Sequence, residues 1–277
     1  MTRFILALGL LSTKYVFAAP FIHPETEHLL ITPQDIPENG ILRVEHFERL
    51  KTLSFSEGNF SGLRLLKVDN NIQLSSLTLP EGLISLQRLE IMHLPELRII
   101  QLPKSLTSLQ VLKISANPRI PFLAVPETLA ALQRLSISSN AQLETVVIPG
   151  SLNKLQILNI DNNTRLLELN IPDGLTGLRR FACSCSDNLR FLTMGNEDSS
   201  WSHLQGFYLV NALHLRSLSL SRSIIRRSHD LSQAHEKTPA ALAQIARSLW
   251  LGFDNINRIE VLQDPEGSED VDRSYRL

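Results

Sequence analysis

The chain is poor in the residues that usually identify a site or stabilise a small fold. Its 277 residues include only two cysteines, Cys183 and Cys185. No second cysteine or histidine pair stands at ligand spacing, so a structural zinc site is excluded. Aromatic residues make up 6% of the chain although 43% of it is hydrophobic, so any core must be largely aliphatic. A formal net charge of −1 lacks the basic excess typical of nucleic-acid binding, and we expect no nucleic-acid partner.

Long apolar runs are scarce, and the main one lies near the N-terminus. FILALGLL (4–11) follows Arg3 and is too short to span a membrane permanently. Val16 and Ala18 place small residues at the −3 and −1 positions of a cleavage site, which predicts a secretory signal peptide over 1–18. We therefore expect a secreted, cell-surface or periplasmic protein with no integral span after signal removal. A misplaced start, a transit peptide, and a cytoplasmic or host-delivered protein are the alternatives.

Enzyme motifs are also missing. There is no P-loop, no glycine-rich dinucleotide turn and no His-Glu-x-x-His. Ser228-His229-Asp230 has the residue types of a catalytic triad, but three consecutive residues do not converge on one reacting atom. We expect no enzyme, no catalytic residue, no cofactor and no bound metal.

What the chain does contain is a 23-residue repeat. Proline recurs at this period, at Pro80, Pro103, Pro126, Pro149 and Pro172. Apolar columns keep the same period, and the consensus is L-x-x-L-x-I-x-x-N-x-x-L-x-x-L-x-I-P-x-x-L-x-x. A fixed period of this size predicts a solenoid whose coils bury their apolar side chains only against neighbouring coils.

The columns assign a role to each position of the coil. The apolar columns, such as Leu112, Leu135 and Leu158, are expected to point inward. Asparagine recurs at Asn71, Asn117, Asn140 and Asn163, and we expect it to turn inward and bridge backbone groups of adjacent coils. Proline lacks an N–H group and is expected to mark the end of a strand.

These motifs resemble the leucine-rich-repeat family. The resemblance to the family rests on LQVLKISANPRI (109–120) and LQILNIDNNTRL (155–166). Two further segments, LTLPEGL (77–83) and LNIPDGL (169–175), are similar to a bacterial surface-protein class of the same family, whose repeat contains L-x-x-I-x-I-P. It implies an α/β leucine-rich-repeat solenoid, with a curved parallel β-sheet, that binds proteins or other macromolecules without a cofactor. Two cysteines are too few for the disulfide-bonded caps of many extracellular members.

Each coil has two strand-like phrases, such as LQRLEI (86–91) and LRIIQL (97–102). Either could line the concave side, and we favour the phrase that precedes asparagine. Flanking the solenoid (41–220), we expect a signal peptide (1–18), a segment leading into the repeats (19–40), a linker (221–237), a helix-and-strand cap (238–262) and a disordered acidic tail (263–277). Trp201 lies in a longer inter-repeat segment, either at the tip of a bulging loop or folded onto the core.

Alternation along the first phrase sends side chains outward, where they could contact a partner. The candidate partner-binding residues are Arg88, Glu90, Lys113, Arg134, Asn159, Asp161 and Arg180. The arginines occupy every second coil and should stand about 10 Å apart, which would suit acidic groups on a partner. An ordinary solvated face is the alternative. On the second phrase Ile99, Phe122, Val147 and Phe191 either face outward as a contact site or twist inward.

The expected function is therefore non-enzymatic binding of a protein or other macromolecular ligand on the concave face, with the oligomeric state open. One alternative is a structural envelope or adhesion scaffold. Another is a bacterial effector, since Cys185-Ser-Asp187 is similar to the Cys-x-Asp of repeat-bearing ubiquitin ligases. In that family the motif lies in a helical domain after the repeats, whereas here it lies within one.

Overall fold

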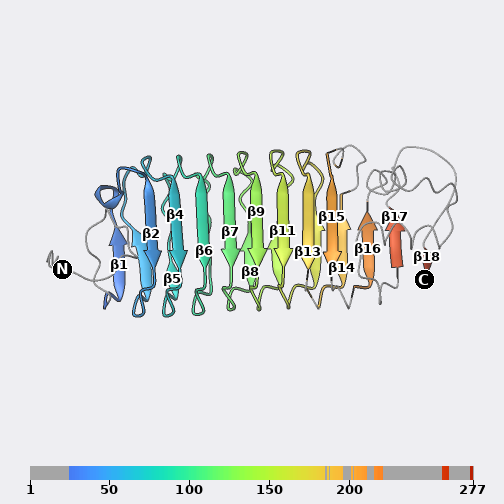
Figure 1. The fold of residues 1–277 in the computed structure, drawn as a ribbon, viewed down its shortest axis with the longest axis horizontal. Helices are drawn as coiled ribbons and strands as arrows, with labels where there is room; N and C mark the ends of the chain where they lie inside the picture. The colour runs from blue at the N-terminus through green and yellow to red at the C-terminus, as the bar shows by residue number, and fades with distance from the viewer. Residues whose placement is uncertain are drawn as a thin grey trace.

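The computed structural model describes residues 25–184, 186, 188–195, 201, 203–210, 215–220, 258–261 and 275–276. Within them the chain forms a parallel β-solenoid with two strand-bearing sides (Figure 1). One side is an 8-stranded sheet. Its strands are β2 (Ile41–Glu45), β4 (Leu65–Asp69), β6 (Arg88–Met92), β7 (Val111–Ser115), β9 (Arg134–Ser138), β11 (Ile157–Asp161), β13 (Arg180–Ser184) and β15 (Gly206–Val210).

The other side is built from shorter strands in three separate sheets. The first holds β1 (His28–Ile31), β3 (Thr52–Phe55) and β5 (Ser76–Leu77); the second holds β8 (Phe122–Ala124) and β10 (Thr145–Val147); the third holds β12 (Glu168–Ile171), β14 (Phe191–Met194), β16 (Ser217–Leu220), β17 (Arg258–Val261) and β18 (Tyr275–Arg276). The 8-stranded sheet therefore comes from the phrase before asparagine, and the interrupted side comes from the phrase before proline.

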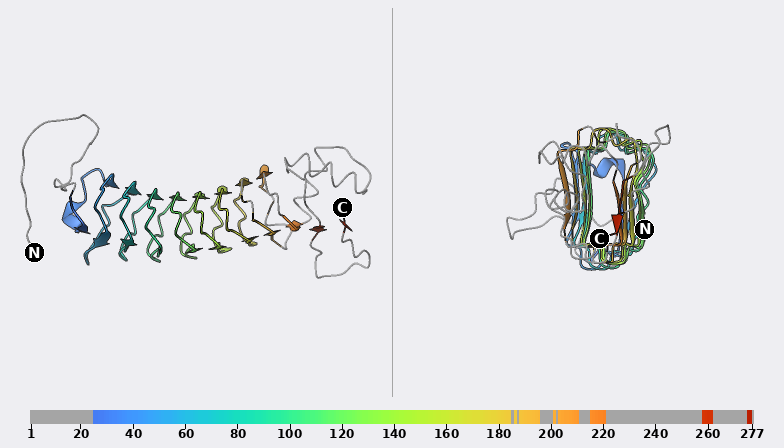
Figure 2. Two further views of the ribbon diagram at one scale, coloured as in Figure 1. Left: turned by 90° about the horizontal axis from the view of Figure 1, so that it is seen from below. Right: turned by 90° about the vertical axis from the view of Figure 1, so that its right-hand side faces the viewer.

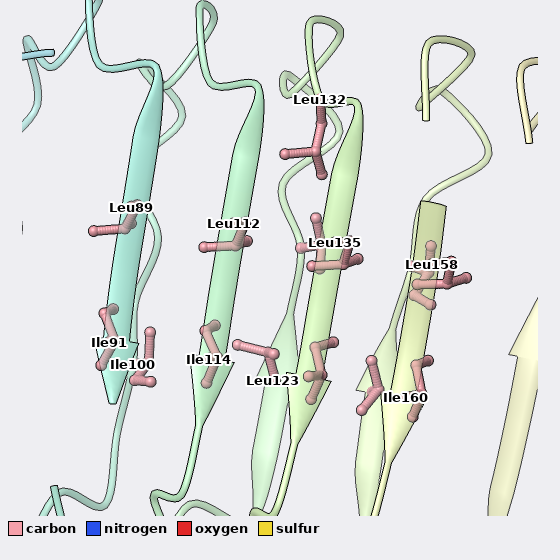
Figure 3. Close-up of a cluster of buried hydrophobic side chains, with 14 of the residues drawn as sticks. Leu89, Ile91, Ile100, Leu112, Ile114, Leu123, Leu132, Leu135, Leu158 and Ile160 are labelled. Atoms are coloured by element: carbon pink, nitrogen blue, oxygen red, sulfur yellow. The ribbon is translucent and has the colours of Figure 1, made fainter. Parts of the chain in front are cut away.

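The core lies between the two sides and confirms the inward columns. Leu112, Leu135 and Leu158 are in register on neighbouring strands and are fully buried. Figure 3 shows them stacked along the solenoid with Ile114 and Leu123 from the two sides. Each coil has too little apolar bulk to form a core alone, so the cluster is continuous from Ile31 to Leu220.

The asparagine column forms a buried ladder, as the sequence predicted. The Nδ2 group of Asn140 donates to the carbonyl of Ile114 at 3.2 Å, and its Oδ1 accepts from the backbone N–H of Asn117 at 3.1 Å. Asn163 makes the same pair of bonds one coil further on. Because buried backbone groups need partners, these side chains tie each coil to the one before it.

A second ladder was not expected from the sequence. The residue after each long-sheet strand from β2 to β11 adopts a left-handed conformation with φ between 51° and 64°, and its N–H donates to the next coil's backbone at 2.7–3.2 Å. These residues are His46, Asn70, His93, Ala116, Ser139 and Asn162. The conformation turns the chain sharply off the sheet while keeping the backbone paired.

Several expectations need correction. The described residues contain no α-helix, and their helical turns, such as Pro33–Asp35, are of the 3-10 type, so their fold is β-rich rather than α/β. The helix expected to open at Thr238 and stop at Gly252, within the 238–262 cap, and the linker (221–237) lie outside the described residues. β1 pairs with β3, so the segment leading into the repeats already belongs to the solenoid. At the other end, β17 pairs with β16 and lies where the cap (238–262) was expected to add a strand. β18 lies in the tail that we expected to be disordered, and it pairs with β17.

Trp201 is folded onto the core and fully buried, which decides between its two expected positions. Gly195 lies against its indole ring, with φ at 51°. A Cβ atom on Gly195 would stand 2.6 Å from Trp201 Nε1, so the close approach requires glycine there.

Candidate functional site: the concave sheet face

The 8-stranded sheet lies along the inner side of a gently curved solenoid (Figure 2). We call the outward-pointing residues of its strands the concave face. In β9 the side chains of Leu135 and Ile137 enter the core, while Arg134, Ser136 and Ser138 point outward. The same alternation applies along the sheet, as expected for a period of two.

All seven candidate binding residues lie on this face. Arg88, Arg134 and Arg180 are exposed, and Glu90, Lys113, Asn159 and Asp161 are half-buried. In register the arginines alternate with two aliphatic residues, Val111 and Ile157. Arginines two strands apart stand about 10 Å from one another. The outward orientation predicted for these residues is confirmed. The spacing of the arginines and their role in binding stay predictions.

The N-terminal half of the concave face carries an ionic network made of Arg43, Glu45, Lys67 and Asp69, and His93, just beyond β6, hydrogen-bonds to it. Lys67 Nζ lies 2.7 Å from Glu45 Oε1 and 2.9 Å from Asp69 Oδ2. Arg43 Nη1 is 3.4 Å from the same Glu45 oxygen, and His93 Nδ1 is 2.8 Å from Asp69 Oδ1. The charges in this half therefore largely neutralise one another.

The network also shifts the protonation of its two central groups. Partial burial works to raise the pKa of Asp69, but hydrogen bonds from Lys67 and His93 outweigh it, so the pKa lies below its usual value. Burial likewise works to lower the pKa of Lys67, and the hydrogen bonds to Asp69 and Glu45 raise it overall. Both groups are thus held in their charged forms.

The rest of the concave face, from β7 to β15, is here called the C-terminal half, and it has a different balance of charge. Within the part of the chain that the structure describes, no carboxylate lies within salt-bridge distance of Lys113, Arg134 or Arg180. Arg88, nearer the network, is held by Glu90 at 3.3 Å. Asp161 accepts hydrogen bonds from Ser184, at 2.9 Å from the backbone N–H and 2.7 Å from Oγ. This half therefore presents cationic donors with no acid to satisfy them.

Two further features belong to the same half. The guanidinium of Arg180 lies over the ring of Tyr208, 4.8 Å from its centroid, a geometry that orients the cation without neutralising it. Asn159 Oδ1 is buried and accepts no hydrogen bond from the described residues. Unpaired buried acceptors are uncommon in folded proteins, and each calls for an explanation such as strain, a catalytic role, or a bound water or ion.

Sequence reasoning missed several members of this face. Lys67 and Asp69 stand 23 residues before Glu90 and Met92 in the same outward columns, so extending the columns one coil back would have found them. Arg43 stands 24 residues before Lys67, and this break in the period hid it. Tyr208 follows the longer inter-repeat segment, so no fixed period pointed to it.

The opposite side of the solenoid bears on the second candidate surface. Ile99, Phe122, Val147 and Phe191 are 66%, 51%, 46% and 42% exposed, so the inward-twisted alternative is wrong.

Cys183 is buried in the core, as expected of a small apolar residue, and its Sγ is 3.8 Å from Ser186 Oγ. Cys185 and Asp187, the residues of the effector alternative, lie outside the described residues.

Nothing in the described part of the chain assembles three or more His, Cys, Asp or Glu side chains into a metal-binding group. Among these described residues there is also no helix long and apolar enough to cross a membrane.

Comparison with known proteins adds no family to these observations. The chain is shown to be a parallel β-solenoid with a continuous charged sheet face, and its relation to the leucine-rich repeats stays a resemblance of motifs. Neither the protein-family models nor the curated proteins yielded a match to this chain.

Proposed function

We propose that this protein is a non-enzymatic binding protein of the leucine-rich-repeat type that engages an acidic segment of a macromolecular partner on its concave face. The observation that carries the proposal is the set of uncompensated cations Lys113, Arg134 and Arg180. A surface that neutralises its own charges in one half and leaves them open in the other favours contact at the open half. Such complementarity gives specificity and speeds association.

The leucine-rich-repeat assignment is supported by three features together. The coils repeat every 23 residues, the long sheet comes from the phrase before asparagine, and asparagine bonds the backbone of the preceding coil. Delivery outside the producing cell is part of the proposal and rests on residues 1–18 alone.

The test is a charge reversal of these three cations. The partner would be isolated on the immobilised chain from an extract of the producing cells, identified by mass spectrometry and titrated against purified variants. In Lys113→Glu/Arg134→Glu/Arg180→Glu, each lost contact is worth up to about 1 kcal/mol, so affinity should fall roughly 100-fold.

A matched control reverses three arginines at the start of the second strand-like phrase of their coils: Arg98→Glu/Arg190→Glu/Arg216→Glu. These residues are exposed and the net charge changes equally. The affinity of the control for the partner should lie within about twofold of that of the parent. A change in overall charge acts mainly on the rate at which the two molecules meet, and this effect is screened by salt. Equal losses in both triple variants, or none in the first, would count against the concave face.

A further inference from the structure

One outward column of the concave face alternates cationic and aliphatic side chains. It crosses the long sheet with one residue per strand, from β6 through β7, β9 and β11 to β13 (Figure 1). We call the five residues in register along it, Arg88, Val111, Arg134, Ile157 and Arg180, the arginine line. The arginines are exposed and the aliphatic residues are half-buried. A ligand that follows the line therefore meets a cation at every second strand and apolar surface between the cations.

The period of the line restricts the conformation of a ligand that carries regularly spaced acids. Neighbouring strands lie about 4.8 Å apart, so successive arginines should stand about 9.6 Å apart. A polyproline II helix brings every third residue back to the same face after about 9.3 Å. A β-strand does so after about 6.7 Å, and an α-helix does so over seven residues, after about 10.5 Å. The polyproline II period is therefore the nearest to the spacing of the line.

We propose that the acidic segment bound by the concave face is a polyproline II segment that lies along the arginine line, with aspartate or glutamate at every third position. This inference rests on the proposed function, because it names the segment of the partner that the face engages. Successive carboxylates pair with Arg134 and Arg180, and an apolar residue between them contacts Ile157. Arg88 lies on the same line, but it is already held by Glu90 at 3.3 Å and is the weaker site.

Hydrogen-bond donors beside the line favour this conformation over a helix. Lys113 and Ser136 are neighbours in register in the next outward column. No carboxylate of the described ranges lies within salt-bridge distance of Lys113. The backbone of a polyproline II segment has no internal hydrogen bonds, so its carbonyl groups can accept from these two side chains. In an α-helix the same carbonyl groups are occupied by its own N–H groups.

The apolar side chains favour a peptide over an acidic polysaccharide. Val111 and Ile157 leave apolar surface between the cations, and a proline ring covers such surface without placing hydroxyl groups against it. Tyr208 lies beyond the line on β15, is 37% exposed, and carries the guanidinium of Arg180 over its ring. Exposed aromatic rings are the usual contact surface for proline-rich segments. The C-terminal half of the concave face thus presents cations, aliphatic surface and an aromatic ring together.

Fluorescence anisotropy with the full chain and two labelled peptides tests the proposal in about 50 mM salt, where surface charges are only weakly screened. Both peptides have twelve residues, three aspartates and nine prolines. The first has aspartate at its first, fourth and seventh positions, which share one face of a polyproline II helix. The second has aspartate at its first, fifth and ninth positions, which point in three directions. The first should bind about tenfold more tightly, because the second loses two arginine contacts worth up to about fivefold each.

A variant of the line shows whether the preference comes from these arginines. In Arg134→Gln the middle cation is lost, and the preference for the first peptide should fall to about threefold or less. Arg190→Gln is the matched control, because Arg190 is exposed outside the concave face and the charge changes equally. It should keep the tenfold preference. Circular dichroism of both variants would confirm that they are folded, as expected for exposed side chains.

Equal affinities of the two peptides, or no binding of the first below about 1 mM, would overturn the proposal. So would tighter binding of a helical peptide with glutamate at every seventh position, or of trigalacturonate, which also carries three carboxylates. Equal peptide affinities together with loss of the partner in the charge-reversed chain would refute this inference and leave the proposed function intact. A peptide preference without any loss of partner binding in that chain would refute the proposed function alone.

Discussion

The buried asparagine ladder makes a quantitative prediction at Asn140. The fully buried side chain joins three coils, because it accepts from Asn117 and donates to Ile114 and to Asn163 Oδ1. In Asn140→Ala the backbone N–H of Asn117 and the carbonyl of Ile114 lose these partners. Each orphaned buried group costs about 1–3 kcal/mol, so unfolding free energy should fall by roughly 2–6 kcal/mol.

The assay is equilibrium urea unfolding followed by far-ultraviolet circular dichroism. Asn170→Ala is the matched control, since Asn170 is exposed on β12 and the substitution removes the same atoms. Its unfolding free energy should change by less than about 0.5 kcal/mol, as is usual for surface substitutions. A loss below about 1 kcal/mol in Asn140→Ala, or equal losses in the two variants, would refute the reasoning that the ladder satisfies the backbone.

Three other predictions concern the core, the ionic network and the unpaired acceptor. Leu135→Asp buries an unpaired charge in the middle of the stack and should unfold the repeats. The control Arg134→Asp, on the same strand but facing outward, should have a melting temperature close to that of the parent. Similar melting temperatures for the two variants would contradict the inward column. Because the pKa of Asp69 is lowered, the stability that its carboxylate contributes is present above the unfolded pKa of 3.8 and is lost as the pH falls through the folded pKa. Below about pH 4 the melting temperature should therefore fall more steeply with pH for the parent than for Asp69→Asn. Parallel curves of melting temperature against pH would contradict this. Asn159→Ser removes a buried oxygen without a described partner, so its melting temperature should stay near or above that of the parent, and a drop comparable to that of Asn140→Ala would show that the oxygen is satisfied.

The repeat made most of the fold predictable, because each column meets the same environment in every coil. The inward leucines, the asparagine bonds and the outward arginines all follow from the period and from strand alternation. The left-handed residues escaped prediction because hydrogen bonds to the next coil hold His93, Ala116 and Ser139 in a conformation that their side chains do not favour.

The division of the concave face also escaped prediction, for a physical reason. The sequence shows which side chains point outward, but not which acids reach which bases. Lys67 is neutralised by two carboxylates, while Arg134, in an equivalent strand, meets none in the described residues. Long side chains choose among neighbours on adjacent coils, and only the three-dimensional structure shows that choice.

Photo-crosslinking from the concave face tests the central claim most directly. In one variant a benzophenone amino acid would replace Ser136, which lies between Lys113 and Asn159 in register. In the control variant it would replace Thr193 on the convex side, which is half-buried like Ser136. The account predicts a covalent adduct with the partner from position 136 and none from position 193. An adduct from 193 with none from 136 would contradict it.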